Sequence, residues 1–182
     1  MVRKPQISVI GYNAELCTDA AYKAAYGVGV SIAKSGAVLI SGGLKGVMEA
    51  ASQGAAETGG LVVGIIPSDD SRDANEHCDV VIPSGLGLAR NFLVVNSADA
   101  VVIVGGGSGT LTEAAAAYGK RIPLVAVKGT GGVADEWAGR YFDGRKTARV
   151  MEADSPEEAV AVALRARARR APNRFRKRPL AP

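Results

Sequence analysis

Short apolar runs alternate with amphipathic segments along most of the chain. The runs are four to six residues long, and most of their positions are hydrophobic, which is typical of strands buried on both faces. They occupy residues 6–10, 37–41, 61–66, 79–82, 99–104, 122–127 and 147–151. Strands of this kind require helices on both sides of the sheet, so the pattern predicts a mostly parallel sheet.

The first intervening segment predicts a helix over residues 19–35. Its apolar positions recur three or four residues apart, at Ala21, Ala25, Val28 and Ile32. Thr18 or Asp19 can cap its start, and Gly36 can terminate it. Gly27 and Gly29 weaken a helix intrinsically, so we interpret them as points of close approach to the sheet.

Later segments continue the alternation of strand and helix. Helices are predicted at 46–57, 86–97 and 110–118, with a short one near Trp137 and a last one starting at the capping sequence Ser155-Pro156-Glu157-Glu158. The helix at 86–97 looks buried. Residues 1–165 are therefore predicted to form a single Rossmann-like α/β domain, with about six or seven strands and helices on both faces.

Composition restricts the class of protein. The chain has 182 residues, of which 47% are hydrophobic and only 5% aromatic, so it can bury a core but offers little for stacking nucleic-acid bases. No apolar run approaches the roughly 18 residues that span a bilayer, and we expect a cytoplasmic protein. Cys17 and Cys78 lack metal-binding spacing, so no metal, cofactor or disulfide scaffold is expected.

Charge is distributed unevenly along the chain. Residues 165–182 hold eight of the 22 basic residues and no acidic one, whereas the rest carries 14 basic and 18 acidic residues, a net charge of −4. Residues 166–182 are predicted to form a flexible basic tail. Nucleic-acid binding rests on this tail alone and ranks last among the functions, because the body is acidic and poor in aromatic residues.

The first candidate binding segment is the glycine turn SGGLKGVM at residues 41–48. It follows a strand and opens a helix, where glycines let the backbone approach a ligand and the first helical N–H groups favour phosphate. The candidate phosphate-binding residues are Gly42, Gly43, Gly46 and Met48. An ordinary strand-to-helix turn is an equally good interpretation of this segment alone.

The second candidate is the turn GGGSGTLTE at residues 105–113, which also follows a strand. Its candidate phosphate-binding residues are Gly106, Gly107, Gly109 and Thr110. Glu113 lies one helical turn further on and could act in catalysis. Thr110-Leu111-Thr112-Glu113 is also a capping-box sequence, and this alternative ranks ahead of catalysis on the residues alone.

Arg90 and Asn91 lie near the start of the helix predicted at 86–97. An arginine in that place can clamp a phosphate or carboxylate with two parallel hydrogen bonds. The alternative is an ordinary surface arginine. His77 stands beside Cys78, but no second cluster of ligands completes a metal site.

Together these segments resemble the LOG ("lonely guy") superfamily, often labelled "lysine decarboxylase". The resemblance rests on GGxxGxM at 42–48, on Arg90, on Ala98-Asp99-Ala100 and on GGxGTxxE at 106–113. The Arg90-Asn91 pair and the triple glycine are most similar to the branch of molybdenum-cofactor carrier proteins and their bacterial relatives. Asn91, Val94 and Gly105 stand where the enzymes of the superfamily carry Lys, Met and Pro.

The resemblance implies two alternative functions. One is hydrolysis of the N-glycosidic bond of a nucleoside 5'-monophosphate to base and ribose 5-phosphate, with Arg90 and Glu113 as catalytic residues. The other is a non-catalytic carrier or sensor of molybdenum cofactor or another phosphorylated ligand. It also implies a homodimer or higher homo-oligomer. A pyridoxal-phosphate decarboxylase is not expected, because no lysine has a convincing context for a Schiff base.

Overall fold

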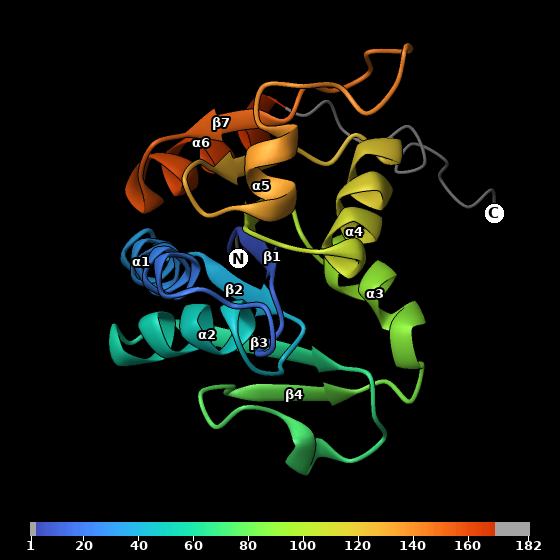
Figure 1. Cartoon of the computed structure of the whole chain (residues 1–182). Coiled ribbons are helices and arrows are strands. Elements are labelled where there is room, and N and C mark those ends of the chain that lie inside the picture. Colours follow the sequence, from blue (N-terminus) through green and yellow to red (C-terminus); the bar gives the residue numbers. More distant parts are fainter. Residues whose placement is uncertain (1–2, 170–182) are drawn as a thin grey trace, which may run out of the picture.

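A computed structural model describes residues 3–169 as one seven-stranded sheet (Figure 1). All neighbouring strands pair in parallel, in the order β4-β3-β2-β1-β5-β6-β7. The strands are β1 (Gln6–Gly11), β2 (Val38–Ser41), β3 (Leu61–Ile66), β4 (Val80–Pro83), β5 (Ala100–Val104), β6 (Leu124–Val127) and β7 (Met151–Ala153).

Helices cover both faces of the sheet (Figure 1). One face packs against α1 (Asp19–Lys34), α2 (Val47–Glu57) and α6 (Pro156–Arg169). The other packs against α3 (Asn91–Asn96), α4 (Ser108–Gly119) and α5 (Gly132–Trp137). Two short 3₁₀ helices, η1 (Ser71–Asp73) and η2 (Gly87–Arg90), lie in the connections. Each face has its own aliphatic core, and the predicted Rossmann-like α/β fold is confirmed.

Helix α1 has the predicted N-cap, but its glycines do not contact the sheet as expected. The Thr18 hydroxyl accepts a hydrogen bond from the N–H of Ala21 at 3.2 Å, as expected of an N-cap. The expectation that Gly27 and Gly29 approach the sheet is wrong. A Cβ on Gly29 would lie 2.0 Å from the carbonyl oxygen of Ala51 in α2, and one on Gly27 would meet Pro156 of α6. The sheet-facing side of α1 is aliphatic, and its glycines admit neighbouring helices instead.

The segment predicted as one buried helix over 86–97 differs in two respects. It is divided into η2 and α3, and several of its large apolar side chains are exposed. Leu88 is 85% exposed and Phe92 is 48% exposed, whereas Val94 and Val95 are buried against the sheet. Only one side of this short segment faces the core. The last strand also starts four residues later than predicted, at Met151.

The final helix begins as predicted, with the Ser155 hydroxyl accepting from the N–H of Glu158 at 3.1 Å. It continues to Arg169, four residues beyond the expected domain boundary at 165. The remainder of the predicted basic tail lies outside the described residues, so this division stays a prediction. Within residues 3–169, no helix combines the length and apolar character needed to cross a membrane.

Candidate functional site

The chain reverses its direction of winding between β1 and β5. From β1 the strands progress to β2, β3 and β4 on one side, while β5 leads to β6 and β7 on the other. In sheets of this type, ligands bind at the carboxyl ends of the strands where the order reverses. A cavity of about 350 Å³ lies at that point, beside the end of β1 and the turns after β2 and β5.

Eight of the eleven site residues predicted from the sequence line this cavity: Gly42, Met48, Arg90, Asn91, Gly107, Gly109, Thr110 and Glu113. They come from three segments that are far apart in the sequence. The structure therefore brings both glycine turns and the Arg90-Asn91 pair around one space, as a shared ligand site requires.

Gly43, Gly46 and Gly106 are not among the lining residues. All three have positive φ, of 69°, 77° and 110°. Gly46 packs against the backbone of Tyr12 and Asn13 so closely that a Cβ would lie 2.6 Å from the carbonyl carbon of Asn13. These glycines give the turns their backbone conformation and let them pack closely against neighbouring segments.

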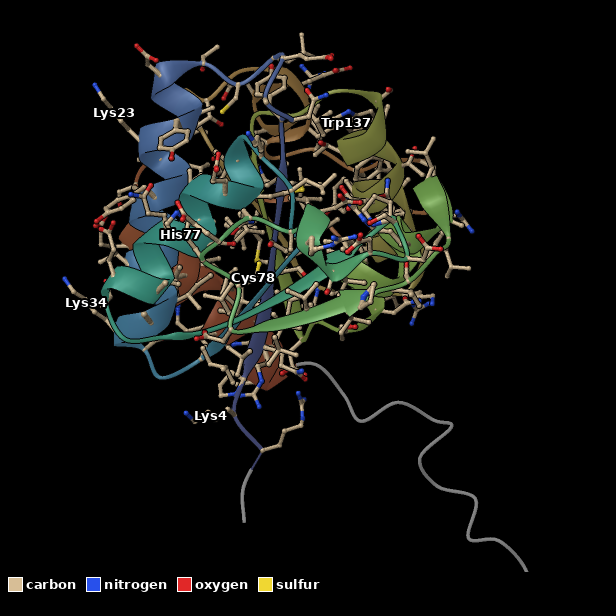
Figure 2. All side chains as sticks on the ribbon, turned by 90° about the horizontal axis from the view of Figure 1, so that it is seen from below. Lys4, Lys23, Lys34, His77, Cys78 and Trp137 are labelled. Carbon is tan, nitrogen blue, oxygen red and sulfur yellow. The ribbon has the colours of Figure 1, made fainter. Side chains whose placement is uncertain are left out.

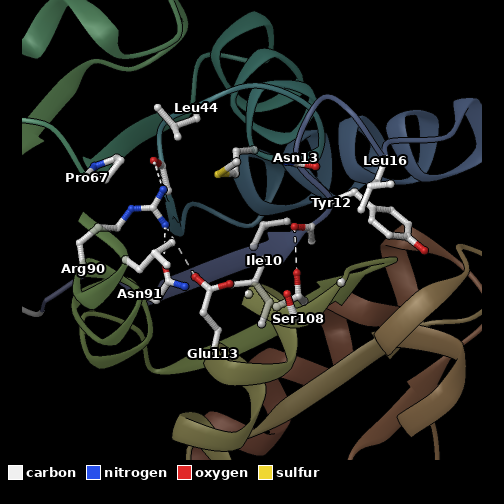
Figure 3. Close-up of a pocket in the computed structure, with 18 of the residues that line it drawn as sticks. Ile10, Tyr12, Asn13, Leu16, Leu44, Pro67, Arg90, Asn91, Ser108 and Glu113 are labelled. Carbon is white, nitrogen blue, oxygen red and sulfur yellow. Dashed lines mark hydrogen bonds and ion pairs between the residues drawn. The ribbon is translucent and has the colours of Figure 1, made fainter. Parts of the chain in front are cut away.

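Arg90 is buried at the end of η2, so the interpretation as an ordinary surface arginine is wrong. Its Nη2 donates to the carbonyl oxygen of Gly42 at 3.0 Å, and its Nη1 donates to Oδ1 of Asn91 at 2.8 Å (Figure 3). Its Nε is buried and has no hydrogen-bond partner among the described residues. Burial lowers the pKa of Arg90, while Glu113 opposes this shift.

Glu113 points toward Arg90 from α4 (Figure 3), and its Oε1 lies 4.0 Å from Nη1 of the arginine. Burial raises the pKa of Glu113 to about 7, against the opposing effect of Arg90. The carboxyl group thus changes its charge near neutral pH. Groups with such shifts concentrate at functional sites.

The capping-box interpretation of Thr110 and Glu113 is wrong. Helix α4 starts at Ser108, its N-cap is Gly107, and no side chain caps it. The Thr110 hydroxyl instead donates to the carbonyl oxygen of Gly11 at 2.9 Å, tying α4 to the end of β1. The first N–H groups of α4 therefore lack side-chain acceptors where Gly107, Ser108 and Gly109 line the cavity, an arrangement that favours an anion.

Sequence reasoning missed several other lining residues. Tyr12, Asn13 and Leu16 come from the loop after β1, and Leu44, Pro67 and Leu88 form further apolar wall. The loop after β1 carries no motif. Its place after the first strand was the one available signal, because all parallel strands end at the same edge.

Sequence reasoning also missed Asn75, which acts from outside the cavity. Its side chain is buried, and its Nδ2 donates to the carbonyl oxygen of Leu44 at 3.0 Å. Its backbone N–H donates to the carbonyl oxygen of Gly43 at 2.8 Å. Asn75 therefore holds the first glycine turn in place.

His77 and Cys78 lie away from the cavity, near α2 and β4 (Figure 2). The Cys78 thiol packs against Gly64 and donates to Oδ1 of Asn75 at 3.6 Å. Within residues 3–169, no three His, Cys, Asp or Glu side chains are grouped so that they could hold a metal ion.

Comparison with known proteins gives one family match. The model of the SLOG cluster4 family matches residues 4–160. A protein of Archaeoglobus fulgidus, described as uncharacterized, is 47% identical over 130 residues, which cover 68% of this chain and 84% of that protein.

Two solved structures resemble the chain over almost their full length. The molybdenum cofactor binding protein from Rippkaea orientalis is 36% identical with a TM-score of 0.81, covering 91% of this chain and 98% of that one. A Moco carrier protein from Chlamydomonas reinhardtii is 32% identical with a TM-score of 0.79, covering 91% and 99%.

Proposed function

Since the chain belongs to the SLOG cluster4 family, within the expected LOG-like superfamily, we propose that it binds a phosphorylated small molecule and serves as a molybdenum-cofactor carrier. The proposal assigns the chain to the carrier branch of the superfamily. The named functions of the Rippkaea and Chlamydomonas proteins support the choice of ligand. The observation that carries the proposal is a buried arginine in the wall of the cavity, Arg90, whose Nε has no hydrogen-bond partner among the described residues.

A buried guanidinium N–H without an acceptor is costly, and an anionic ligand group can supply that acceptor. The other two guanidinium nitrogens are already bonded to Gly42 and Asn91, so the arginine is held in one orientation before a ligand arrives. The uncapped start of α4 offers a second group of anion-binding donors. We place the phosphate at this start, contacted by Gly107, Gly109 and Thr110.

The remaining walls suit a flat heterocycle such as a pterin. Leu44, Met48, Pro67 and Leu88 provide apolar surface, and Glu113 provides a carboxyl group at the polar end of the cavity. When ionised, this group accepts hydrogen bonds from ring N–H or amino groups, and when protonated it donates one. A volume of about 350 Å³ is in the range of small-molecule sites.

Phosphoribohydrolase activity is the second candidate, and the facing pair of Arg90 and Glu113 favours it. In this reaction Glu113 would stabilise the oxocarbenium-like transition state or orient the attacking water, and Arg90 would assist the leaving base. The substrate would be a nucleoside 5'-monophosphate. Asn91, Val94 and Gly105, which depart from the enzymes' pattern, favour the carrier.

One experiment distinguishes the two candidates. The purified protein is titrated with molybdenum cofactor and with a panel of nucleoside monophosphates, and free base and ribose 5-phosphate are measured in the same samples. The carrier proposal predicts tight binding of molybdenum cofactor and no release of base. Catalytic release of base from any member of the panel would instead establish the hydrolase.

We further propose that the protein forms a homodimer through the exposed apolar surface of η2 and α3. Its large side chains are Leu86, Leu88, Phe92 and Leu93. Contiguous apolar surface of this kind marks interaction sites. Leu88 also lines the cavity, so this interface would lie at the mouth of the ligand site. A cytoplasmic location stays a prediction.

A further inference from the structure

A second cavity, of about 320 Å³, lies at the amino edge of the sheet, opposite the candidate functional site. It is bounded by the turn before β6, the start of β7 and the last turns of α6. Three arginines line it: Arg121, Arg165 and Arg169. The other lining residues are Pro123, Met151, Val162 and Ala166, so no acidic side chain lines this cavity.

None of the three guanidinium groups makes a hydrogen bond or ion pair with another residue between 3 and 169. Other arginines of the same region have an acidic partner. Arg3 and Arg167, for example, both pair with Asp99. The cavity therefore gathers three positive charges without an acidic counterpart from the described residues.

Arg121 has a backbone conformation that costs less free energy for glycine than for arginine. It follows the end of α4 with φ 55°, in the left-handed region that glycine or asparagine usually occupies after a helix. Basic residues at the ends of α4 and α6 complement the helix dipoles. That effect does not explain why three side chains from two separate segments converge on one cavity.

The sequence after Arg169 adds charge of the same sign. Five more basic residues occur between 170 and 178, and residues 165–182 contain no acid. Seven of the eight basic residues in 165–182 are arginines, whose planar guanidinium groups bind phosphate oxygens in pairs. Eight charges over 14 residues exceed what one small phosphate needs, so they favour an extended polyanion.

We propose that Arg121, Arg165 and Arg169 form a phosphate-binding pocket that holds the sugar–phosphate backbone of a nucleic acid. Phosphate contacts give affinity without reading the base sequence. Sequence reasoning ranks nucleic acid last because the body is acidic and poor in aromatic residues, which leaves only the basic residues at 165–182 to support it. The structure shows that Arg121, which lies outside this basic segment, lines the same cavity as Arg165 and Arg169. This site is independent of the proposed carrier function.

The test measures binding of a fluorescently labelled 20-nucleotide RNA to the full chain at several salt concentrations. Arg121→Gly removes one charge and relieves the left-handed backbone, so the melting temperature should hold or rise. The affinity should nevertheless fall about fivefold at low salt, and the slope of log affinity against log salt should decrease by about one. The double variant R165Q/R169Q should reduce this slope by about two.

Lys23→Gln is the matched control, because it removes one exposed charge from α1, where Lys23 projects outward (Figure 2). It should leave RNA affinity unchanged. Failure of the wild type to bind RNA would overturn the proposal, as would wild-type affinity and slope in both arginine variants. Stronger binding to phosphatidylserine-containing vesicles than to RNA, lost in the same variants, would also overturn it in favour of a membrane surface. Unchanged binding of small phosphorylated ligands by R121G keeps this outcome separate from the carrier proposal.

Discussion

The guanidinium of Arg90 and the carboxyl group of Glu113 face each other at 4.0 Å, with only 9% of each side chain exposed. This distance exceeds that of a hydrogen bond, so each partner retains bonding capacity toward the cavity. Arg90 comes from η2 and Glu113 comes from α4. They meet where the strand order reverses between β1 and β5, because segments from both halves of the sheet lie around this point. The pair can therefore bind a ligand that carries both a hydrogen-bond acceptor for Arg90 and a hydrogen-bond donor for Glu113.

Glu113→Gln should distinguish carrier from hydrolase. For a carrier, neither the wild type nor the variant releases base from nucleoside monophosphates, and only ligand affinity changes. A hydrolase would retain binding in the nearly isosteric variant but lose about 2–4 kcal/mol of transition-state stabilisation. Base release and equilibrium affinity, measured on the same preparations, decide between these outcomes.

The pKa of Glu113 should make the stability of the ligand-free protein depend on pH. Its pKa is about 7 when folded and near the usual 4.5 when unfolded, so between these values the folded state binds the extra proton. Stability should therefore be full below pH 4.5 and fall by roughly 3 kcal/mol as pH rises through 7. Urea unfolding at pH 5 and pH 8 measures the difference.

Glu113→Gln should remove this part of the pH dependence, whereas Glu136→Gln, at an exposed position of α5, should retain it. An unchanged difference between pH 5 and pH 8 in the Glu113 variant would contradict the assignment.

Gly107→Val should block the ligand site without unfolding the protein. Gly107 has φ −110°, and a Cβ there would have Leu16 as its nearest neighbour, with Cδ1 at 3.7 Å. The added side chain would occupy the space assigned to the phosphate, while stability should change by less than about 1 kcal/mol. Calorimetric titration with ligand and a thermal melt provide the two readouts. Gly119→Val, at the open far end of α4, is the control and should bind normally.

Leu88→Glu should convert the proposed homodimer to a monomer. Leu88 is 85% exposed in the single chain, and an unpaired charge buried in an apolar interface is strongly unfavourable. Light scattering coupled to size-exclusion chromatography gives the mass. Tyr141→Glu, at a residue 40% exposed in the connection between α5 and β7, should leave the mass unchanged. A wild-type monomer would contradict the interface.

Asn75→Asp should weaken ligand binding although Asn75 does not line the cavity. The carboxylate cannot donate to the carbonyl oxygen of Leu44, so the first glycine turn loses one of its two bonds to this residue. Loss of a buried bond of this kind costs about 1–3 kcal/mol. An affinity equal to that of the wild type would show that Gly43 and its neighbours hold their position without the amide.

The fold was largely predictable because its strands are buried on both faces, which leaves continuous apolar runs such as 100–104. Both glycine turns and Arg90 were found because a ligand site at the strand ends needs specific residue types in short segments. The contacts of Asn75, Leu16 and Arg121 were not found, because each joins segments far apart in the sequence. The exposed face of η2 and α3 was misjudged, since apolar spacing in a short helix does not say whether a neighbour covers it.

The contact of α1 with α2 has a mechanical consequence. Gly29 lies against Ala51, and Gly54 lies against Tyr26, where an added Cβ would be 2.2 Å from the carbonyl oxygen of Tyr26. Backbone therefore touches backbone, and the two helices have no soft layer of side chains between them at these points. The first glycine turn is joined directly to α2, so this side of the cavity is stiff. Leu88 lines the cavity from η2 and is exposed, so entry of a ligand should move this side chain rather than the glycine turn.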